Sequence, residues 1–189
     1  METRRIDKEE LSAEHYKTTL CINKVKICSN CPLKLYAKKN ENIVLGIGNV
    51  VTDTIMVLPS YDVKAKIGYR TMLNVIQDVY RELTSRDILE DYYITRSIKC
   101  LNKTDFNLEK DAIKHCITNL FYEISRINPK KLIIFDKHLY DFGLYRCNQG
   151  KFIVKTCVSP AVMYYDNQKL KDVFIKQFNA AVNDTQLCI

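Results

Sequence analysis

The sequence predicts an α/β domain in which helices sandwich a parallel sheet. Four short apolar runs of β type occur along the chain, at 54–58, 92–98, 132–135 and 152–158. Short continuous apolar runs suit strands that are buried on both faces. Helical patterns separate these runs, and strands that alternate with helices favour a parallel sheet between helical layers. The length of 189 residues suits a single domain, 1–189.

The N-terminal part is expected to differ from the rest of this domain. Residues 1–40 combine an expected helix at 8–18 with a segment rich in cysteine and lysine at 21–40. We expect this part to pack on an α/β core formed by residues 41–189.

Three helices are expected within the core, at 71–83, 109–127 and 170–182. In each of them apolar residues recur every three or four positions, which gives one buried stripe. The dipeptide Asn128-Pro129 ends the second helix. Because ligands bind at the carboxyl ends of the strands in such sheets, the residues that follow each strand are the candidates for a site.

Charge and hydropathy limit the classes of partner. The chain has 29 Lys and Arg against 22 Asp and Glu, a net charge of +7, which suits a polyanionic partner such as DNA. The charged N-terminus has no apolar core of a secretory signal, and no stretch approaches the roughly 20 apolar residues that span a bilayer. We therefore expect an intracellular, soluble protein of the cytoplasm or nucleoid, with no membrane partner.

Cysteine is the unusual residue, with eight copies in the chain. Cys28 and Cys31 form a CxxC pair, Cys100 follows the second expected strand, and Cys116 lies on the next helix. A CxxC pair lets two thiolates share a metal, although the same spacing serves redox motifs. Cys100 and Cys116 can complete a four-thiolate site, which accepts either zinc or an iron–sulfur cluster. Cys116 alone equally suits a small core residue on an apolar stripe.

Several strings in the chain together resemble one known family. They are CSNCPLKLYAKK at 28–39, GIGN at 46–49, YITRSIKC at 93–100, LEKDAIKHC at 108–116 and VSPAVMYYDNQKLKDVF at 158–174. In this order they resemble the iron–sulfur uracil-DNA glycosylases, family 4 of the uracil-DNA glycosylase superfamily. The resemblance implies a three-layer α/β/α sandwich with a four-stranded parallel sheet.

The same resemblance implies a cofactor. It places a [4Fe–4S] cluster on four cysteines: Cys28, Cys31, Cys100 and Cys116. Zinc is the alternative occupant, because the number of thiolates does not separate the two.

The resemblance also predicts a degenerate active site. Positions where the family carries the residues of its base pocket hold other residues here: Ser60, Lys66, Arg96 and Ser159. Base excision needs a flipped and stacked base, a residue that positions water and a donor to the departing base, and these replacements remove such groups. Asp62 and Tyr69 are the candidate substitutes in a rebuilt pocket, although a solvated loop acid is the simpler interpretation of Asp62.

Features of DNA binding survive in the sequence. The candidate contacts are Lys34, Lys38, Lys39, Arg96, Lys99, Tyr164 and Tyr165. The basic side chains can hold phosphates, and the two tyrosines can stack on bases. The alternatives are a solvated basic surface and aromatic side chains that pack against the last helix.

Three functions remain open at this point. The first is a catalytically degenerate, glycosylase-like iron–sulfur protein that binds DNA as an accessory component of replication or repair. Its partner would then be a polymerase or another replication or repair protein, by analogy of fold alone. The second is an active DNA glycosylase with a pocket rebuilt for uracil or another base, and the third is a redox or scaffold protein that uses the cluster itself. The composition, rich in Lys, Asn, Ile and Tyr, suggests an AT-rich genome, which suits a viral protein in the cytoplasm of a host cell.

Overall fold

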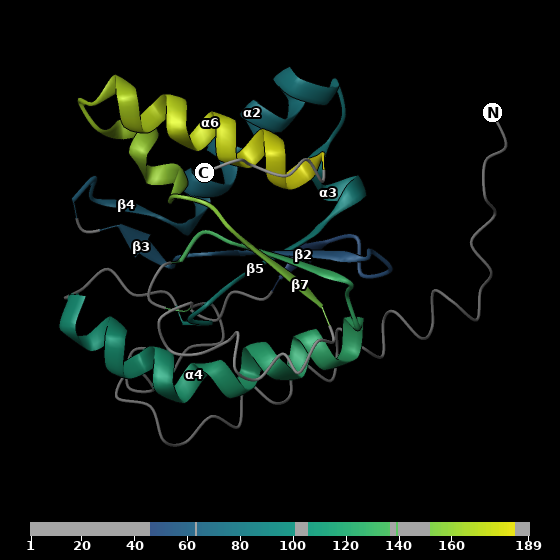
Figure 1. The fold of residues 1–189 in the computed structure, drawn as a ribbon. Helices are drawn as coiled ribbons and strands as arrows, with labels where there is room; N and C mark the ends of the chain where they lie inside the picture. The colour runs from purple at the N-terminus through teal and green to yellow at the C-terminus, as the bar shows by residue number, and fades with distance from the viewer. Residues whose placement is uncertain (1–45, 63, 101–105, 137–138, 140–151, 184–189) are drawn as a thin grey trace, which may run out of the picture.

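The computed structural model describes residues 46–62, 64–100, 106–136, 139 and 152–183 (Figure 1). Their elements are β1 (Ile47–Gly48), β2 (Thr54–Leu58), β3 (Tyr61–Asp62), β4 (Ile67–Gly68), α2 (Tyr69–Thr84), α3 (Ile88–Asp91), β5 (Tyr93–Arg96), α4 (Phe106–Ile127), β6 (Lys131–Ile134), β7 (Ile153–Thr156), the 3-10 helix η3 (Pro160–Tyr164) and α6 (Gln168–Val182). The predicted helix at 8–18 and the cysteine-rich segment at 21–40 lie outside the described residues.

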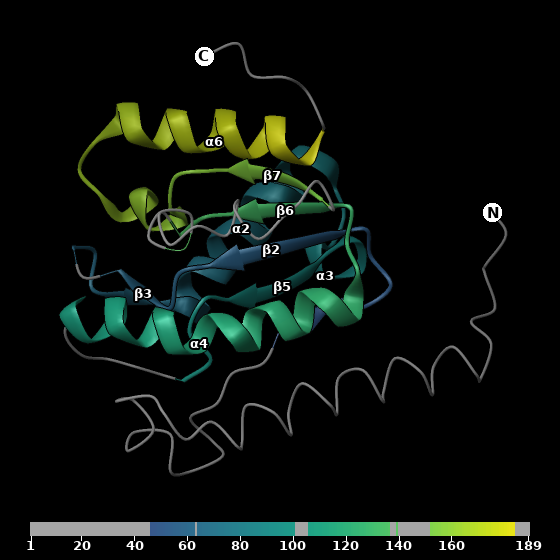
Figure 2. The same cartoon turned by 60° about the horizontal axis from the view of Figure 1, so that its bottom comes forward.

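The central sheet is mainly parallel and has five strands in the order β1-β5-β2-β6-β7. Strands β5, β2, β6 and β7 are parallel to one another, as the sequence predicts. The expected number of four is wrong for the sheet as a whole, because the two-residue strand β1 adds an antiparallel edge beside β5. Figure 2 shows the four parallel strands side by side, with their arrowheads toward the side where β3 lies.

Glycine makes the added strand β1 possible. Gly48 has a φ of +98°, which L side chains rarely adopt. A Cβ atom on Gly48 would lie 2.3 Å from the carbonyl oxygen of Tyr92, so any side chain would collide with the backbone of the neighbouring strand segment. The GIGN turn therefore serves the close approach of β1 to β5.

Helices cover both faces of the sheet (Figures 1 and 2). Along β2, Ile55 and Val57 pack with the apolar stripe of α4, whereas Met56 and Leu58 pack with α2 and α6. This alternation within one strand follows from the two-residue period of β structure. Strand β2 thus has one set of apolar side chains for each helical layer, which explains the continuous apolar run from Ile55 to Leu58.

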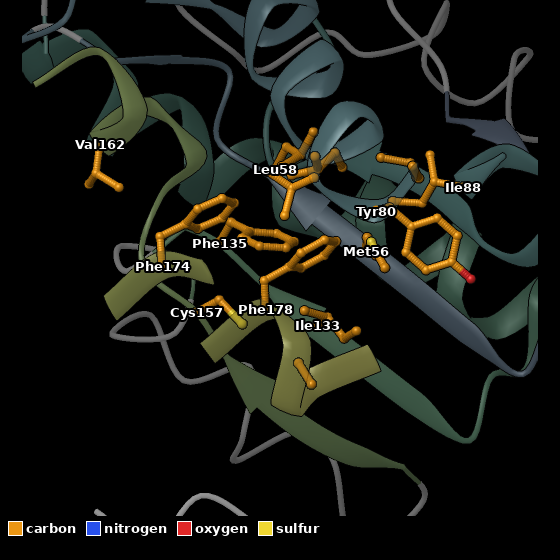
Figure 3. Packing of buried hydrophobic residues seen from close by; sticks show 14 of the residues in the cluster. Met56, Leu58, Tyr80, Ile88, Ile133, Phe135, Cys157, Val162, Phe174 and Phe178 are labelled. Carbon is orange, nitrogen blue, oxygen red and sulfur yellow. The ribbon is translucent and has the colours of Figure 1, made fainter. Parts of the chain in front are cut away.

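Aromatic side chains fill the layer between the sheet and α6 (Figure 3). The rings of Phe174 and Phe178 are stacked with centroids 5.8 Å apart, and Phe135 lies 5.9 Å from Phe178 between centroids. All three side chains are buried. Burial of such a side chain contributes about 1.5–3 kcal/mol relative to its exposure, so this cluster fixes α6 on the sheet.

The predicted helices at 71–83, 109–127 and 170–182 are present as α2, α4 and α6, with longer N-terminal ends. The expected strands at 92–98 and 152–158 are shorter than predicted, because only Tyr93–Arg96 and Ile153–Thr156 pair with a neighbouring strand. No helix in the described part of the chain is long and apolar enough to cross a membrane.

Candidate functional site

The four parallel strands end at one edge of the sheet, which we call the carboxyl edge. After β2 the chain first adds β5 on one side and later adds β6 on the other side of β2. Ligands of open α/β sheets bind in the crevice outside the strand ends at such a reversal of strand order. The residues that follow β2, β5 and β6 are therefore the first candidates for a site.

Arg96 ends β5 at the carboxyl edge and is fully buried, with 0% of its surface exposed. Its guanidinium carbon lies 5.5 Å from the centroid of the Tyr69 ring, and its Nη2 donates a hydrogen bond of 2.7 Å to the carbonyl oxygen of Lys99. Desolvation raises the pKa of Tyr69 well above its ordinary value, and the neighbouring Arg96 charge partly offsets this rise. In this arrangement Arg96 occupies the interior and is not exposed to a phosphate, in contrast to the predicted role.

Lys99 also differs from its predicted role as an exposed DNA contact, because 0% of its surface is exposed. Its Nζ forms a buried ion pair with Glu123 on α4 and donates a hydrogen bond to Thr95 Oγ1. Thr95 Oγ1 in turn donates to Glu123 Oε2 over 2.9 Å. A buried ammonium that is paired in this way is not available to a nucleic acid. The prediction that Lys99 contacts DNA is therefore wrong.

Hydroxyl groups at the carboxyl edge are used inside the protein. Ser60, which follows β2, donates to the carbonyl oxygen of Ile98 over 3.1 Å. Ser97 donates to Asp136 Oδ2 over 2.5 Å, and the Leu139 backbone N–H donates to Asp136 Oδ1 over 3.3 Å. Neither Ser97 nor Asp136 is among the predicted site residues, although a polar residue at the end of a buried strand is a signal that marks both positions.

Asp62 and Tyr165 join two segments that are far apart in the sequence. The Tyr165 hydroxyl donates to Asp62 Oδ2 over 2.8 Å, and the Ala65 backbone N–H donates to Asp62 Oδ1 over 2.8 Å. Desolvation, with a further contribution from Asp62, raises the pKa of Tyr165 to about 12. The Nζ of Lys64 lies 4.3 Å from the centroid of the Tyr165 ring. Both predicted roles, a water-positioning acid at Asp62 and a base-stacking ring at Tyr165, fall on groups that already have protein partners.

Ser159 has a local structural role in this arrangement. Its Oγ accepts a hydrogen bond from the Ala161 backbone N–H over 3.2 Å, which caps the N-terminus of η3. It also donates to the sulfur of Met72 on α2 over 3.7 Å. The cap sets the course of the chain into η3, whose last residue, Tyr164, is 56% exposed.

Exposed basic side chains gather around the β3–β4 hairpin at the carboxyl edge. We call Lys64, Lys66 and Arg70 the hairpin cations; all three are exposed. Lys66 lies in the hairpin turn with a φ of 55°, and Arg70 is in the first turn of α2. Figure 1 shows β3, β4 and the segment that contains η3 on the same side of the molecule. The predicted contacts Lys34, Lys38 and Lys39 lie outside the described residues.

Two of the four predicted metal ligands can be placed. Cys100 and Cys116 are both buried and belong to the same core cluster, between the sheet and α4. Cys28 and Cys31 lie outside the described residues. Among the residues that the structure describes, no group of three or more His, Cys, Asp or Glu side chains is arranged to hold a metal ion.

The surroundings of Cys116 fit a thiolate ligand. Its Sγ accepts hydrogen bonds from the Lys99 backbone N–H, over 3.4 Å, and from the Asn119 side-chain amide, over 3.9 Å. Hydrogen bonds to a charged acceptor are stronger than those to a neutral one, so both donors favour the thiolate. Cys157 makes a contrast, because desolvation among apolar side chains raises the pKa of that thiol to about 12. The donor set at Cys116 is therefore compatible with the predicted cluster or with zinc.

Comparison with known proteins leaves the family open. No protein-family model matches the chain, and no curated protein matches it. The function proposed for the chain therefore rests on its sequence motifs, on the residues at the carboxyl edge and on the two buried cysteines.

Proposed function

We propose that this chain is a catalytically degenerate, uracil-DNA-glycosylase-like iron–sulfur protein that binds DNA without excising a base. The proposal combines the resemblance to the family 4 enzymes with a parallel-dominated sheet that has helices on both faces. In this proposal the protein acts as an accessory component of replication or repair. Its partner is a polymerase or another replication or repair protein.

One observation carries the loss of excision. The buried Arg96 side chain and the Tyr69 ring occupy the end of β5, where the resemblance puts the base-reading residue. A glycosylase must admit a flipped base to a preformed pocket. A fully buried guanidinium group at that place competes with the base for the same volume.

The polar groups at three of the other predicted pocket positions are engaged within the protein. Ser60 is hydrogen bonded to a backbone carbonyl, Ser159 caps η3, and Asp62 is engaged by Tyr165. Positioning a water and stabilising a departing base require groups that face the substrate. The alternative of an enzyme rebuilt around Asp62 and Tyr69 has less support, because both groups are held by neighbouring residues.

DNA binding is supported by the hairpin cations and by Tyr164. Basic residues that neutralise phosphates give an affinity that depends on salt, and exposed aromatic rings add stacking on unpaired bases. Lys64, Lys66 and Arg70 supply the charge, and the exposed Tyr164 supplies a ring directly before Tyr165, which contacts Lys64. This combination favours single-stranded DNA over duplex.

The proposed cofactor is a [4Fe–4S] cluster on Cys28, Cys31, Cys100 and Cys116, with zinc as the alternative. Its support is the sequence spacing together with the two N–H donors on the Cys116 sulfur. Such a cluster would tie the N-terminal segment to the core, because metal binding and folding are coupled when ligands come from separate segments.

The deciding experiment measures binding and cleavage in parallel. The full chain, purified anaerobically, is mixed with fluorescent oligonucleotides, single- and double-stranded, each with and without uracil. We expect binding to all of them, tighter for single strands, and no abasic product. Uracil release above the background of a Cys116→Ser protein would contradict the loss of excision, and the absence of binding at low salt would contradict the role in DNA binding.

A further inference from the structure

A buried polar network links the end of β5 to α4. The Nζ of Lys99 pairs with Glu123, and the hydroxyls of Tyr93 and Thr95 donate to Glu123 Oε1 and Oε2 over 3.3 and 2.9 Å. Lys99 is 0% exposed and Glu123 is 1% exposed. Burial of two charges costs several kcal/mol, and a hydrophobic pair of similar volume is often as stable or more stable. Overall stability alone therefore does not account for this pair.

The same lysine contacts the proposed metal site through its backbone. The Lys99 N–H donates to Cys116 Sγ over 3.4 Å, and Lys99 directly precedes Cys100 in the chain. The Nη2 of Arg96 donates to the Lys99 carbonyl oxygen over 2.7 Å. Lys99 is thus fixed by its side chain, its N–H and its carbonyl group, between the two cysteines.

The partners on α4 share one face of the helix. Cys116, Asn119 and Glu123 follow one another at spacings of three and four residues, which places them above one another on an α-helix. Glu123 holds the Lys99 side chain, and Asn119 donates its amide to Cys116 Sγ over 3.9 Å. The ion pair therefore sets how the end of β5 lies along α4, and with it the relative position of Cys100 and Cys116.

We propose that Lys99, Glu123 and Asn119 are positioning residues of the metal-thiolate site. The Lys99–Glu123 pair holds the two cysteine-bearing segments together, and the N–H groups of Lys99 and Asn119 stabilise the Cys116 thiolate. This inference rests on the proposed function only in requiring that the site holds a metal. Residues that hydrogen bond to metal ligands commonly change metal affinity by about 10–100-fold when they are replaced.

The first test removes one donor to the sulfur. Asn119→Leu keeps the volume of the side chain and deletes the N–H group, and Asn179→Leu on α6 is the matched control on an exposed helix position. Each full-length protein is reconstituted anaerobically with iron and sulfide. We expect Asn119→Leu to shift the reduction potential to a lower value and to release iron to a chelator about 10-fold faster or more. The control should match the wild type in both measurements.

The second test removes the ion pair and preserves the core. The double variant Lys99→Met, Glu123→Leu replaces the buried charges by apolar side chains, which a protein core commonly tolerates. We expect a folded protein that releases metal faster than the wild type; its thermal stability without metal falls at most by the loss of the acceptor for the Tyr93 and Thr95 hydroxyls. A purely structural role would leave the release rate and the visible spectrum unchanged.

The outcomes separate this inference from the proposed function. Unchanged potential, spectrum and release rate in both variants, with a wild type that binds metal, overturn the inference and leave the cofactor intact. If the wild type takes up zinc instead of a cluster, zinc release to the same chelator tests the positioning role equally. A wild type that binds neither metal overturns the proposed cofactor, and the inference with it.

Discussion

The guanidinium group of Arg96 lies against the ring of Tyr69, with 5.5 Å between the guanidinium carbon and the ring centroid. The contact joins the end of β5 to the first residue of α2, so it connects the sheet to one helical layer. Both residues are buried, which makes the interaction part of the core. Its position at the carboxyl edge gives the protein a structural group where a base-excising enzyme of the proposed kind would need an open pocket.

Replacement of Arg96 by alanine is expected to lower the free energy of unfolding by about 2–4 kcal/mol, because a large buried side chain and its hydrogen bond are lost together. Uracil excision should remain absent, since Ser60, Ser159 and Asp62 keep their protein partners. Urea denaturation and the oligonucleotide assay measure the two effects. The exposed Arg70→Ala should change stability by less than about 0.5 kcal/mol. Excision by the Arg96→Ala protein would show that the guanidinium alone blocks an otherwise complete site.

The hairpin cations are expected to dominate the salt dependence of DNA binding. In the triple variant Lys64→Ala, Lys66→Ala, Arg70→Ala, affinity should depend less steeply on salt. The magnitude of the log–log slope should fall by about 2 for single-stranded DNA. Titrations by fluorescence anisotropy at several salt concentrations measure this slope.

A matched control removes the same charge from the opposite edge of the sheet. The control uses three exposed residues. Arg81 lies in the last turn of α2, Arg126 in the last turn of α4, and Lys130 directly before β6. In their triple alanine variant, the log–log slope should differ from that of the wild type by less than about 0.7, the change expected for one phosphate contact on a single strand. Equal slopes for the two triple variants would mean that net charge, and not the hairpin surface, accounts for binding.

Cys116 and Cys157 are expected to behave differently although both are buried. Cys116→Ser should abolish stoichiometric iron uptake, because serine is a poor ligand for an iron–sulfur cluster in place of a thiolate. Cys157→Ser should leave the iron content unchanged, since that thiol lies among apolar side chains without a role in the proposed site. Iron and sulfide analysis of anaerobic protein measures both. Loss of iron in the Cys157→Ser protein would contradict the proposed ligand set, because it would make Cys157 a ligand.

Stability should fall in alkaline solution over a defined range of pH. The folded state raises the pKa of Cys157 from 9.0 to about 12 and that of Tyr165 from 10.0 to about 12. Above pH 9 the unfolded chain loses protons that the folded protein retains, so the free energy of unfolding declines between about pH 9 and 12. Urea denaturation at about pH 8, 9, 10 and 11 measures the decline.

Two variants isolate the contributions of Cys157 and Tyr165 to this decline, to which the raised pKa values of Tyr69 and Tyr80 also contribute. Cys157→Ala should weaken the dependence from about pH 9 upward, and Tyr165→Phe should weaken it only from about pH 10 upward. The substitutions remove the titrating groups and keep most of the packing. A pH dependence identical to that of the wild type in both variants would contradict this assignment.

Gly48 is expected to tolerate no side chain. Gly48→Ala should destabilise the protein by about 1–3 kcal/mol or more, because the φ of the residue and the Tyr92 carbonyl oxygen both exclude a Cβ atom. Gly68→Ala is the control, since a Cβ there meets no atom within 4 Å. Thermal unfolding of the two variants compares them directly, and equal melting temperatures would contradict the role of Gly48 in seating β1.

The sequence predicts the main helices and the four parallel strands because their signals are local. Apolar periodicity marks α2, α4 and α6, and continuous apolar runs mark the strands. Other elements are too short to show a period of apolar residues in the sequence. They are the two-residue strand β1, the β3–β4 hairpin and η3. Their formation depends on partners elsewhere in the fold, such as Asp62 for the segment after η3.

The candidate site is less predictable, because a sequence shows charge but not what the charge meets. Arg96 ends β5 and Lys99 follows it, and cationic residues at the end of a strand are commonly exposed. The structure instead pairs Lys99 with Glu123, which lies 24 residues along the chain on α4, the helix that connects β5 to β6. Tyr164 and Tyr165 are neighbours in sequence, yet the first is exposed and the second is bonded to Asp62. Only tertiary structure separates such cases.

The order of the strands has a consequence for the speed of folding. Ile55, in the middle of the sheet, pairs with Tyr93 on one side and with Leu132 on the other. Because the chain must close both long connections before these pairings stabilise it, domains of this topology refold more slowly than helical bundles of the same size. During synthesis on the ribosome, one edge of the apolar strand β2 stays uncovered until β6 has emerged. We therefore expect nascent chains that end before β6 to aggregate, and to depend on chaperones that shield exposed strands.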